Sequence, residues 1–243
     1  MKVDNVKPYE GSEPKERQVK VMFDRIAFRY DFLNHFLSLG IDRMWRRRVV
    51  RMVRDSLARE MLDMATGTGD LAIMTLKALP DITVTGMDIS PRMMEIAEHK
   101  IERSGLRDRM KLRESAAEEL ASADDVFDVA TVAFGVRNFS DIPQGVRELR
   151  RSLKPGGKLI VLEFGMPRNK VFGPLFAFYF RKILPFVGGV ISGEKKAYRY
   201  LQESVEDFPY GDGFAGIMRD AGFRNVRVMA MTFGLALIYE GEK

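Results

Sequence analysis

A short glycine-rich turn between an apolar run and an amphipathic run constrains this chain more than any other feature. Met61-Leu62-Asp63-Met64 leads into Ala65-Thr66-Gly67-Thr68-Gly69, and a helical pattern follows from Asp70. Glycines suit such a turn because the backbone must bend sharply and approach a ligand without Cβ atoms in the way. A second apolar run ends at Asp88, about 20 residues further on, where an acid can hold ribose hydroxyls. The stretch therefore predicts a strand, a turn and a helix that bind a nucleoside cofactor.

The charge around this turn bears on which nucleoside binds there. Asp63 and Asp70 flank the turn, and no lysine or arginine lies between Arg59 and Lys77. A pyrophosphate favours a helix N-terminus without nearby acids, whereas acids suit a cationic cofactor such as S-adenosylmethionine. Asp70 also has an ordinary explanation, because acids favour the first turn of a helix. The spacing Gly67-x-Gly69-x-x-Ala72 still fits a dehydrogenase fingerprint, so a nicotinamide enzyme remains an alternative.

Strand and helix patterns alternate from residue 60 onward, which indicates an α/β fold with a mainly parallel sheet covered on both faces. Ser90-Pro91 predicts a helix start and Gly105 its end. In such sheets the ligand lies beyond the carboxyl ends of the strands. Further strands are predicted at 110–113, 126–132 and 158–164, a helix at 140–152, and an antiparallel hairpin at 226–239.

The chain is predicted to form one domain at 16–243, preceded by a flexible tail at 1–15 that contains prolines and glycine. We expect N-terminal helices at 16–58, with Asp42 as the N-cap of the second helix. Arg43, Arg47, Arg51 and Arg54 would form one basic face of that helix, for which solvation is the common explanation and an acidic membrane surface the alternative. The remaining parts are a cofactor-binding core at 59–164, a substrate-side insertion at 165–210, and a C-terminal helix and hairpin at 211–243.

Composition excludes several classes of protein. Apolar residues make up 46% of the chain, enough for a large core. The absence of cysteine and the presence of only two histidines argue against disulfides and against a metal site. No signal peptide is apparent, so we expect a cytoplasmic protein. The segment Val171–Ile191 is apolar and aromatic, but charges and prolines interrupt it too often for a membrane span; a helical layer, a lid or an apolar channel are the alternatives.

Several motifs together resemble the ubiquinone/menaquinone biosynthesis C-methyltransferase family, within the class I S-adenosylmethionine-dependent methyltransferases. The cofactor turn matches that class with Ala65 in the first glycine position, and the resemblance runs from about residue 20 to the C-terminus. It implies a Rossmann-like, doubly wound, seven-stranded sheet with added helices in the N-terminal region and at 165–210. The other motifs are Tyr30-Asp31-x-x-Asn34-x-x-x-Ser38-x-Gly40 with Trp45-Arg46, Phe134-Gly135-Val136-Arg137-Asn138, Leu153-Lys154-Pro155-Gly156-Gly157, Glu163-Phe164 with Pro167, and Tyr200-Leu201-x-x-Ser204-Val205-x-x-Phe208-Pro209.

The resemblance implies S-adenosylmethionine as cofactor, and implies site residues at the matching positions. Arg137 is the candidate for stabilising a phenolate, with Asp31, Tyr200 and His35 as further catalytic candidates; each also has an ordinary structural explanation. Asp42 stands where the family often has histidine, and Ala133 where it often has a serine that touches the cofactor. The predicted cofactor-binding residues are Asp63, Thr66, Gly67, Thr68, Gly69, Asp88, Ser115, Ala116 and Ala133.

The implied reaction is C-methylation of a polyprenylated hydroquinone: demethylmenaquinol to menaquinol, or the equivalent benzoquinol step. Peripheral contact with the inner face of the membrane and a homo-oligomer are compatible with it. The alternatives are methylation of another small molecule or of RNA, a nicotinamide dehydrogenase, and a non-catalytic cofactor-binding scaffold. A nucleic-acid partner is not expected, because the chain has no appended RNA-binding domain and no aromatic RNA-binding run.

Overall fold

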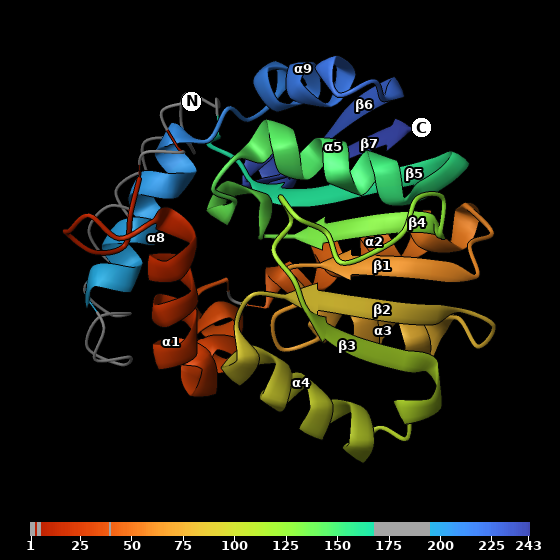
Figure 1. The fold of residues 1–243 in the computed structure, drawn as a ribbon, viewed down its shortest axis with the longest axis horizontal. Helices are drawn as coiled ribbons and strands as arrows, with labels where there is room; N and C mark the ends of the chain where they lie inside the picture. The colour runs from red at the N-terminus through yellow and green to blue at the C-terminus, as the bar shows by residue number, and fades with distance from the viewer. Residues whose placement is uncertain (1–2, 4–5, 39, 168–194) are drawn as a thin grey trace.

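A computed structural model describes residues 3, 6–38, 40–167 and 195–243, and it contains one seven-stranded sheet. The strand order is β3-β2-β1-β4-β5-β7-β6 (Figure 1). The first five strands are parallel, and β7 runs antiparallel to both β5 and β6, which confirms the predicted fold and hairpin. The strands are β1 (Glu60–Met64), β2 (Thr83–Asp88), β3 (Met110–Glu114), β4 (Phe127–Ala133), β5 (Leu153–Phe164), β6 (Arg224–Met231) and β7 (Ala236–Glu242).

Helices cover both faces of the sheet because its strands carry apolar side chains on both sides. In β1, Met61 packs into one core and Leu62 into the other, since successive strand residues point to opposite faces. One core includes α2 (Ile41–Asp55), α3 (Asp70–Ala78) and α4 (Pro91–Arg103). The other includes α5 (Ile142–Ser152) and α9 (Asp212–Asp220), which lie in front of the sheet in Figure 1.

Two more helices, α1 (Lys15–Leu37) and α8 (Lys195–Asp207), stand across the carboxyl ends of the parallel strands (Figure 1). Val19, Met22 and Ile26 of α1 pack with Ala197 and Tyr200 of α8 in a third apolar cluster. The N-terminal helix therefore covers the edge of the sheet at which α/β proteins hold their ligands.

The buried side chain of Lys15 joins the start of α1 to the core. Its Nζ donates to the carbonyl oxygens of Val3, at 2.9 Å, and of Arg137, at 3.2 Å. Val3 itself is fully buried among the side chains that α5 and α9 contribute to their core.

The structure confirms one predicted helix cap and corrects another. The Ser90 hydroxyl accepts from the Met93 N–H, as predicted for a helix cap. The Asp42 cap prediction is wrong, because Gly40 precedes the helix in the left-handed region, with φ 75°, and makes no side-chain cap. Asp42 instead lies in the first turn of α2, where its carboxylate accepts from Ser38 Oγ at 2.7 Å and pairs with Arg46.

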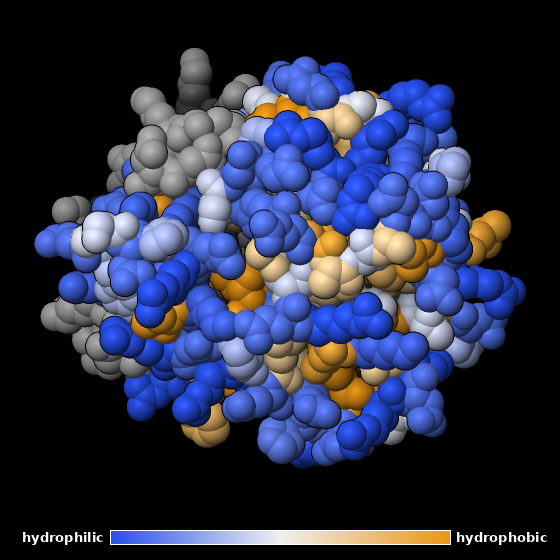
Figure 2. Space-filling view, in the orientation of Figure 1, coloured by the Kyte–Doolittle hydropathy of each residue, from blue (hydrophilic) through white to orange (hydrophobic). Residues whose placement is uncertain are grey.

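Strand β5 begins earlier than predicted, at Leu153 instead of residue 158. Gly156, with φ 77°, allows an irregularity inside the strand, which is accompanied by a register shift against β4. No helix in the described part of the chain is long and apolar enough to cross a membrane. Figure 2 shows one face of the molecule as mostly hydrophilic, with small apolar patches between charged side chains. The segment Val171–Ile191 lies outside the described residues.

Candidate functional site

The cofactor turn connects β1 to α3 in a tight left-handed path. Ala65, Gly67 and Gly69 have φ values of 54°, 56° and 80°. The Thr66 N–H donates to the Met87 carbonyl of β2 at 3.0 Å, which holds the turn against the next strand. Gly69 packs closely on α4, since a Cβ at this position would lie 3.2 Å from that of Ala97. The turn thus exposes backbone where a ligand can approach without side-chain interference.

Asp88, at the end of β2, is held beside this turn. Its Oδ2 accepts from the Gly67 N–H at 2.8 Å and its Oδ1 from the Ser90 N–H at 2.9 Å. Burial raises the pKa of Asp88 to about 6, although these backbone N–H groups favour the charged form. A carboxylate has about four acceptor sites, so Asp88 keeps capacity to accept from ribose hydroxyls.

Asp63 lies beneath the turn and supports it. Its two carboxylate oxygens accept from the hydroxyls of Thr66 and Thr131, both at 2.7 Å. Burial raises the pKa of Asp63 to about 6, because desolvation outweighs these two hydrogen bonds. Asp63 and Thr66 were both predicted to bind the cofactor, and the structure shows that their side chains bond to each other.

A cavity of about 600 Å³, including its open mouth, lies beside the turn; we name it the cofactor cavity. Gly67, Asp88 and Ala133 line it from the sheet, while Phe23 and Tyr30 of α1 cover it. An acid and apolar walls together suit a nucleoside. Among the described residues, Ser140 Oγ and Asn138 Oδ1 are buried without a hydrogen-bond partner, and both residues line this cavity. S-adenosylmethionine therefore fits the residues present, because they offer it a ribose acceptor and unpaired polar atoms.

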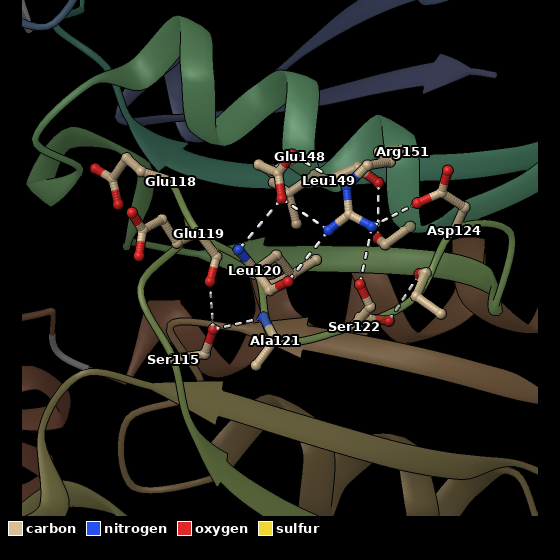
Figure 3. Close-up of polar contacts among 12 residues, drawn as sticks. Ser115, Glu118, Glu119, Leu120, Ala121, Ser122, Asp124, Glu148, Leu149 and Arg151 are labelled. Atoms are coloured by element: carbon tan, nitrogen blue, oxygen red, sulfur yellow. Dashed lines mark hydrogen bonds and ion pairs between the residues drawn. The ribbon is translucent and has the colours of Figure 1, made fainter.

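The loop at 115–124, after β3, forms one wall of the cofactor cavity through Ala117 and Glu118. Figure 3 shows that Arg151 of α5 holds this loop. Its guanidinium donates to the carbonyls of Leu120, at 3.1 Å, and Ser122, at 2.8 Å. The same guanidinium pairs with Asp124 and Glu148.

Ser115, predicted to bind the cofactor, uses its hydroxyl within the loop (Figure 3). Its Oγ lies 3.0 Å from the Ala116 carbonyl and accepts from the Ala121 N–H at 3.0 Å. The buried Ser115 therefore shapes the loop, and its neighbours Ala117 and Glu118 face the cavity.

A lysine that the sequence did not single out joins α1, the cofactor turn and α3. Lys100 Nζ lies 2.8 Å from Asp31 Oδ2, 2.6 Å from Asp70 Oδ1 and 3.0 Å from the Thr68 carbonyl. The Thr68 hydroxyl donates to the other Asp31 oxygen. Asp31 and Thr68 therefore belong to one bridge between helices and turn, and the catalytic role of Asp31 stays a prediction.

A second cavity, of about 660 Å³ with its mouth, adjoins the first; we name it the ring cavity. The two share four lining residues: Phe23, Tyr30, Phe134 and Asn138. The walls of the ring cavity are mostly apolar, and its polar lining includes Asp42, Arg46, Arg137 and Tyr200. A planar, apolar molecule with polar substituents would therefore lie directly next to a nucleoside in the cofactor cavity.

Arg137 is both a structural residue and a donor toward the ring cavity. Its Nη1 donates to Glu163 at 2.7 Å and to the Phe134 carbonyl at 2.6 Å, and the guanidinium lies over the Phe164 ring. Within the described structure its buried Nε has no partner, and the same holds for the Tyr200 hydroxyl. Burial raises the pKa of Tyr200 far above its ordinary value, so this phenol stays neutral and can donate a hydrogen bond.

The structure thus brings most predicted site residues to one edge of the sheet, but it gives several of them supporting contacts. The side chain of His35 lies outside the described residues. Sequence reasoning did not identify the cavity roles of Phe23, Glu118 and Asn138, or the bridge made by Lys100. Phe134 and Asn138 lie inside a quoted motif, which was an available signal, whereas Lys100 looks like any lysine on a helix.

Solved structures with a similar fold are methyltransferases. A possible histamine N-methyltransferase from Thermotoga maritima superposes with a TM-score of 0.62 at 21% identity, covering 92% of this chain and 99% of that one. Human N-acetylserotonin methyltransferase, in complex with S-adenosylmethionine, gives 0.56 at 16% identity, covering 86% and 55%. The sheet order and cofactor turn define the fold of a class I S-adenosylmethionine-dependent methyltransferase.

Sequence comparison narrows this class. The model of the ubiE/COQ5 methyltransferase family matches residues 12–243, and the chain belongs to that family. A demethylmenaquinone methyltransferase from Thermus thermophilus is 46% identical, covering 91% of this chain and 100% of its own. A ubiquinone/menaquinone biosynthesis C-methyltransferase from Geotalea daltonii is 44% identical, covering 94% and 97%. The predicted family and enzyme class are confirmed, and the dehydrogenase and scaffold alternatives no longer apply.

Proposed function

We propose that this enzyme uses S-adenosylmethionine to methylate a ring carbon of a polyprenylated hydroquinone, with demethylmenaquinol as the first candidate and the equivalent benzoquinol as the second. One observation carries the proposal: the cofactor cavity and the ring cavity share a wall of Phe23, Tyr30, Phe134 and Asn138. Two reactants held in adjoining cavities need little further positioning. The names of the relatives from Thermus thermophilus and Geotalea daltonii support the same substrate class.

The chemistry requires charge control at the ring. When bound, S-adenosylmethionine supplies a methyl group on a cationic sulfur and leaves as a neutral thioether. The ring carbon becomes nucleophilic as a ring hydroxyl loses its proton, and after methyl transfer the same carbon loses its hydrogen as a proton. The protein must therefore accept protons and stabilise a negative ring oxygen.

Arg137 and Tyr200 are suited to stabilise that oxygen. The unpartnered Arg137 Nε and the Tyr200 hydroxyl belong to residues that line the ring cavity, and both atoms are buried. A donor in a water-excluded site acts more strongly on developing charge than it would in water. Because Arg137 also pairs with Glu163, its replacement disturbs the fold as well as the site, and Tyr200→Phe is the cleaner probe.

We assign the proton-accepting role to Asp42. It is the one carboxylate among the described residues that line the ring cavity, and it is buried. Arg46 pairs with it and also lies over the Phe134 ring, which fixes both side chains at the cavity wall. The family often has histidine at this position, and histidine is likewise a base.

The experiment combines methyl transfer with variants. The protein is incubated with S-adenosylmethionine labelled in its methyl group and with demethylated naphthoquinols and benzoquinols, and the methylated lipid is identified. Asp42→Asn should lower kcat on the order of 100-fold. Asp42→His should retain activity, with a shifted pH profile. The affinity for S-adenosylmethionine should stay unchanged in both variants. If no methyl group is transferred to either ring, the proposed function is contradicted. If Asp42→Asn keeps full activity, the assignment of Asp42 is contradicted.

Peripheral contact with a membrane follows from the same proposal, because a polyprenylated substrate resides in a lipid bilayer. An apolar chain of this kind partitions into hydrocarbon, at roughly 0.8 kcal/mol per CH₂ group buried. An enzyme that methylates its ring must therefore meet the substrate at the bilayer surface.

A further inference from the structure

An open groove lined by four exposed cations lies between α2, α3 and α4, outside both cavities. Its walls carry Arg43, Arg47, Lys77 and Arg103, all exposed. In the described part of the chain these four side chains form no hydrogen bond or ion pair. Other exposed arginines do pair with acids: Arg17 with Glu13, Arg54 with Asp55, and Arg107 with Glu102.

The charge of this groove is not neutralised by its own acid. Asp70 lines the groove, but its carboxylate is occupied by Lys100 at 2.6 Å and lies 3.9 Å from Arg46. Four like charges that face one open groove repel one another, and an anion would relieve that repulsion.

We propose that this groove docks the enzyme on the anionic phospholipid surface of a bilayer, a proposal that rests on the polyprenylated substrate proposed above. Apolar side chains accompany the cations, as they do on surfaces that lie in a lipid interface. Ile73 and Met74 of α3 line the groove, and Met44 of α2 is 48% exposed. Met44 lies three residues before Arg47, so the two are neighbours on the helix surface.

The position of the groove fits delivery of a lipid substrate. Lys100 and Asp70 line the groove and also hold the cofactor turn and α1, so the groove shares a wall with the edge of the active site. Docking there would place the bilayer beside the helix that covers both cavities. A nucleic acid is disfavoured as the occupant, because the described residues that line the groove include no aromatic side chain on which bases can stack.

The test measures sedimentation of the full chain with phosphatidylcholine vesicles, with and without phosphatidylglycerol. We expect binding to the anionic vesicles only, and we expect it to weaken as salt rises. The Arg43→Glu/Arg47→Glu variant should lose on the order of tenfold or more in affinity. The matched control, Arg147→Glu/Arg219→Glu, makes the same change of charge on α5 and α9, which cover the other face of the sheet, and should bind like wild type.

Three further readouts separate docking from catalysis. S-adenosylmethionine affinity should be equal in all variants, which shows that they are folded. Methylation of a dispersed short-tailed quinol should also be unchanged in the groove variant, while methylation of a long-tailed quinol in anionic vesicles falls. The proposal would be overturned by equal binding to both kinds of vesicle, or by unchanged binding of the groove variant to anionic vesicles. It would also be overturned by tighter binding of a short RNA, or by saturation with inorganic phosphate without vesicle binding. Docking with no methylation of any quinol would contradict the proposed function alone.

Discussion

At the scale of single residues, the cofactor turn leaves room for only one methyl group between two contacting positions, Ala65 and Gly135. Ala65 adopts φ 54°, in the left-handed region, where a residue with a Cβ is less stable than glycine by about 1 kcal/mol. Its Cβ would lie only 2.5 Å from a Cβ built at Gly135, which follows β4. Only one of the two positions can therefore carry a methyl group, and this chain places it at Ala65.

We predict that Gly135→Ala destabilises the protein by about 1–3 kcal/mol because of this clash. The double variant Ala65→Gly/Gly135→Ala should recover most of that loss, since the methyl group is then moved across the contact. Urea unfolding of the four proteins in the cycle measures the coupling free energy, which we expect to be at least about 0.5 kcal/mol. Additive effects would show that the two residues do not contact.

A second residue-scale prediction concerns Asp88. Asp88→Ala should weaken S-adenosylmethionine binding by about 1.5–3 kcal/mol, because a charge-assisted bond to the ribose is lost. Titration calorimetry of the folded variant is the measurement. If the affinity of Asp88→Ala equals that of wild type, Asp88 does not bind the cofactor. The affinity of Asp88→Asn should lie between those of wild type and Asp88→Ala.

At the scale of elements, the loop at 115–124 is held by a neighbouring helix as well as by its own Ser115. Arg151 bonds to the carbonyls of Leu120 and Ser122, and Glu148 accepts from the Leu120 N–H at 3.3 Å (Figure 3). Glu118 accepts from the N–H groups of Ser140 and Asp141 before α5. Helix α5 thereby preorganises one wall of the cofactor cavity.

We predict that Arg151→Ala weakens S-adenosylmethionine binding by on the order of 1–2 kcal/mol, because the loop must then be ordered during binding. The kcat at saturating cofactor should change little, since none of the described loop residues lines the ring cavity. Arg147→Ala is the control: it lies on the same helix, is exposed, and bonds to Gln144. A loss of kcat without a loss of cofactor affinity would contradict this role.

At the scale of the whole molecule, the sheet buries two carboxyls whose pKa values burial raises to about 6, those of Asp63 and Asp88. Between about pH 4 and pH 6 the folded state then binds more protons than the unfolded state. These groups therefore make the free protein less stable as pH rises through that range. The two carboxyls lie at the cofactor site, where a bound cationic cofactor would favour their ionised form.

We predict that Asp63→Asn reduces this pH dependence. The difference in unfolding free energy between wild type and variant should change by up to about 3 kcal/mol between about pH 4 and pH 7, with the wild type relatively less stable at the higher pH. Urea unfolding of both proteins across this range provides the comparison. A difference that stays constant with pH would show that Asp63 has an ordinary pKa in the folded protein.

The sequence by itself determined the fold class, the cofactor turn and the family. These depend on local patterns: the 2-residue and 3.6-residue periods of apolar residues, the glycines of the turn, and the cap at Ser90. Each pattern reports the conformation of its own segment, so no distant contact is needed to interpret it. Asp42 shows the limit even there, since a residue suited to a cap lies inside the first turn of the helix.

The contacts between distant residues depend on how the elements pack together. Lys100 joins α1 to the cofactor turn, Arg151 holds a loop roughly 30 residues earlier in the chain, and Arg137 is divided between Glu163 and the ring cavity. The sequence pattern of a helix shows that a charged side chain faces outward, but it does not show which element lies opposite. That choice depends on sheet order and helix packing, because partners distant in the chain become neighbours only when the strands assemble.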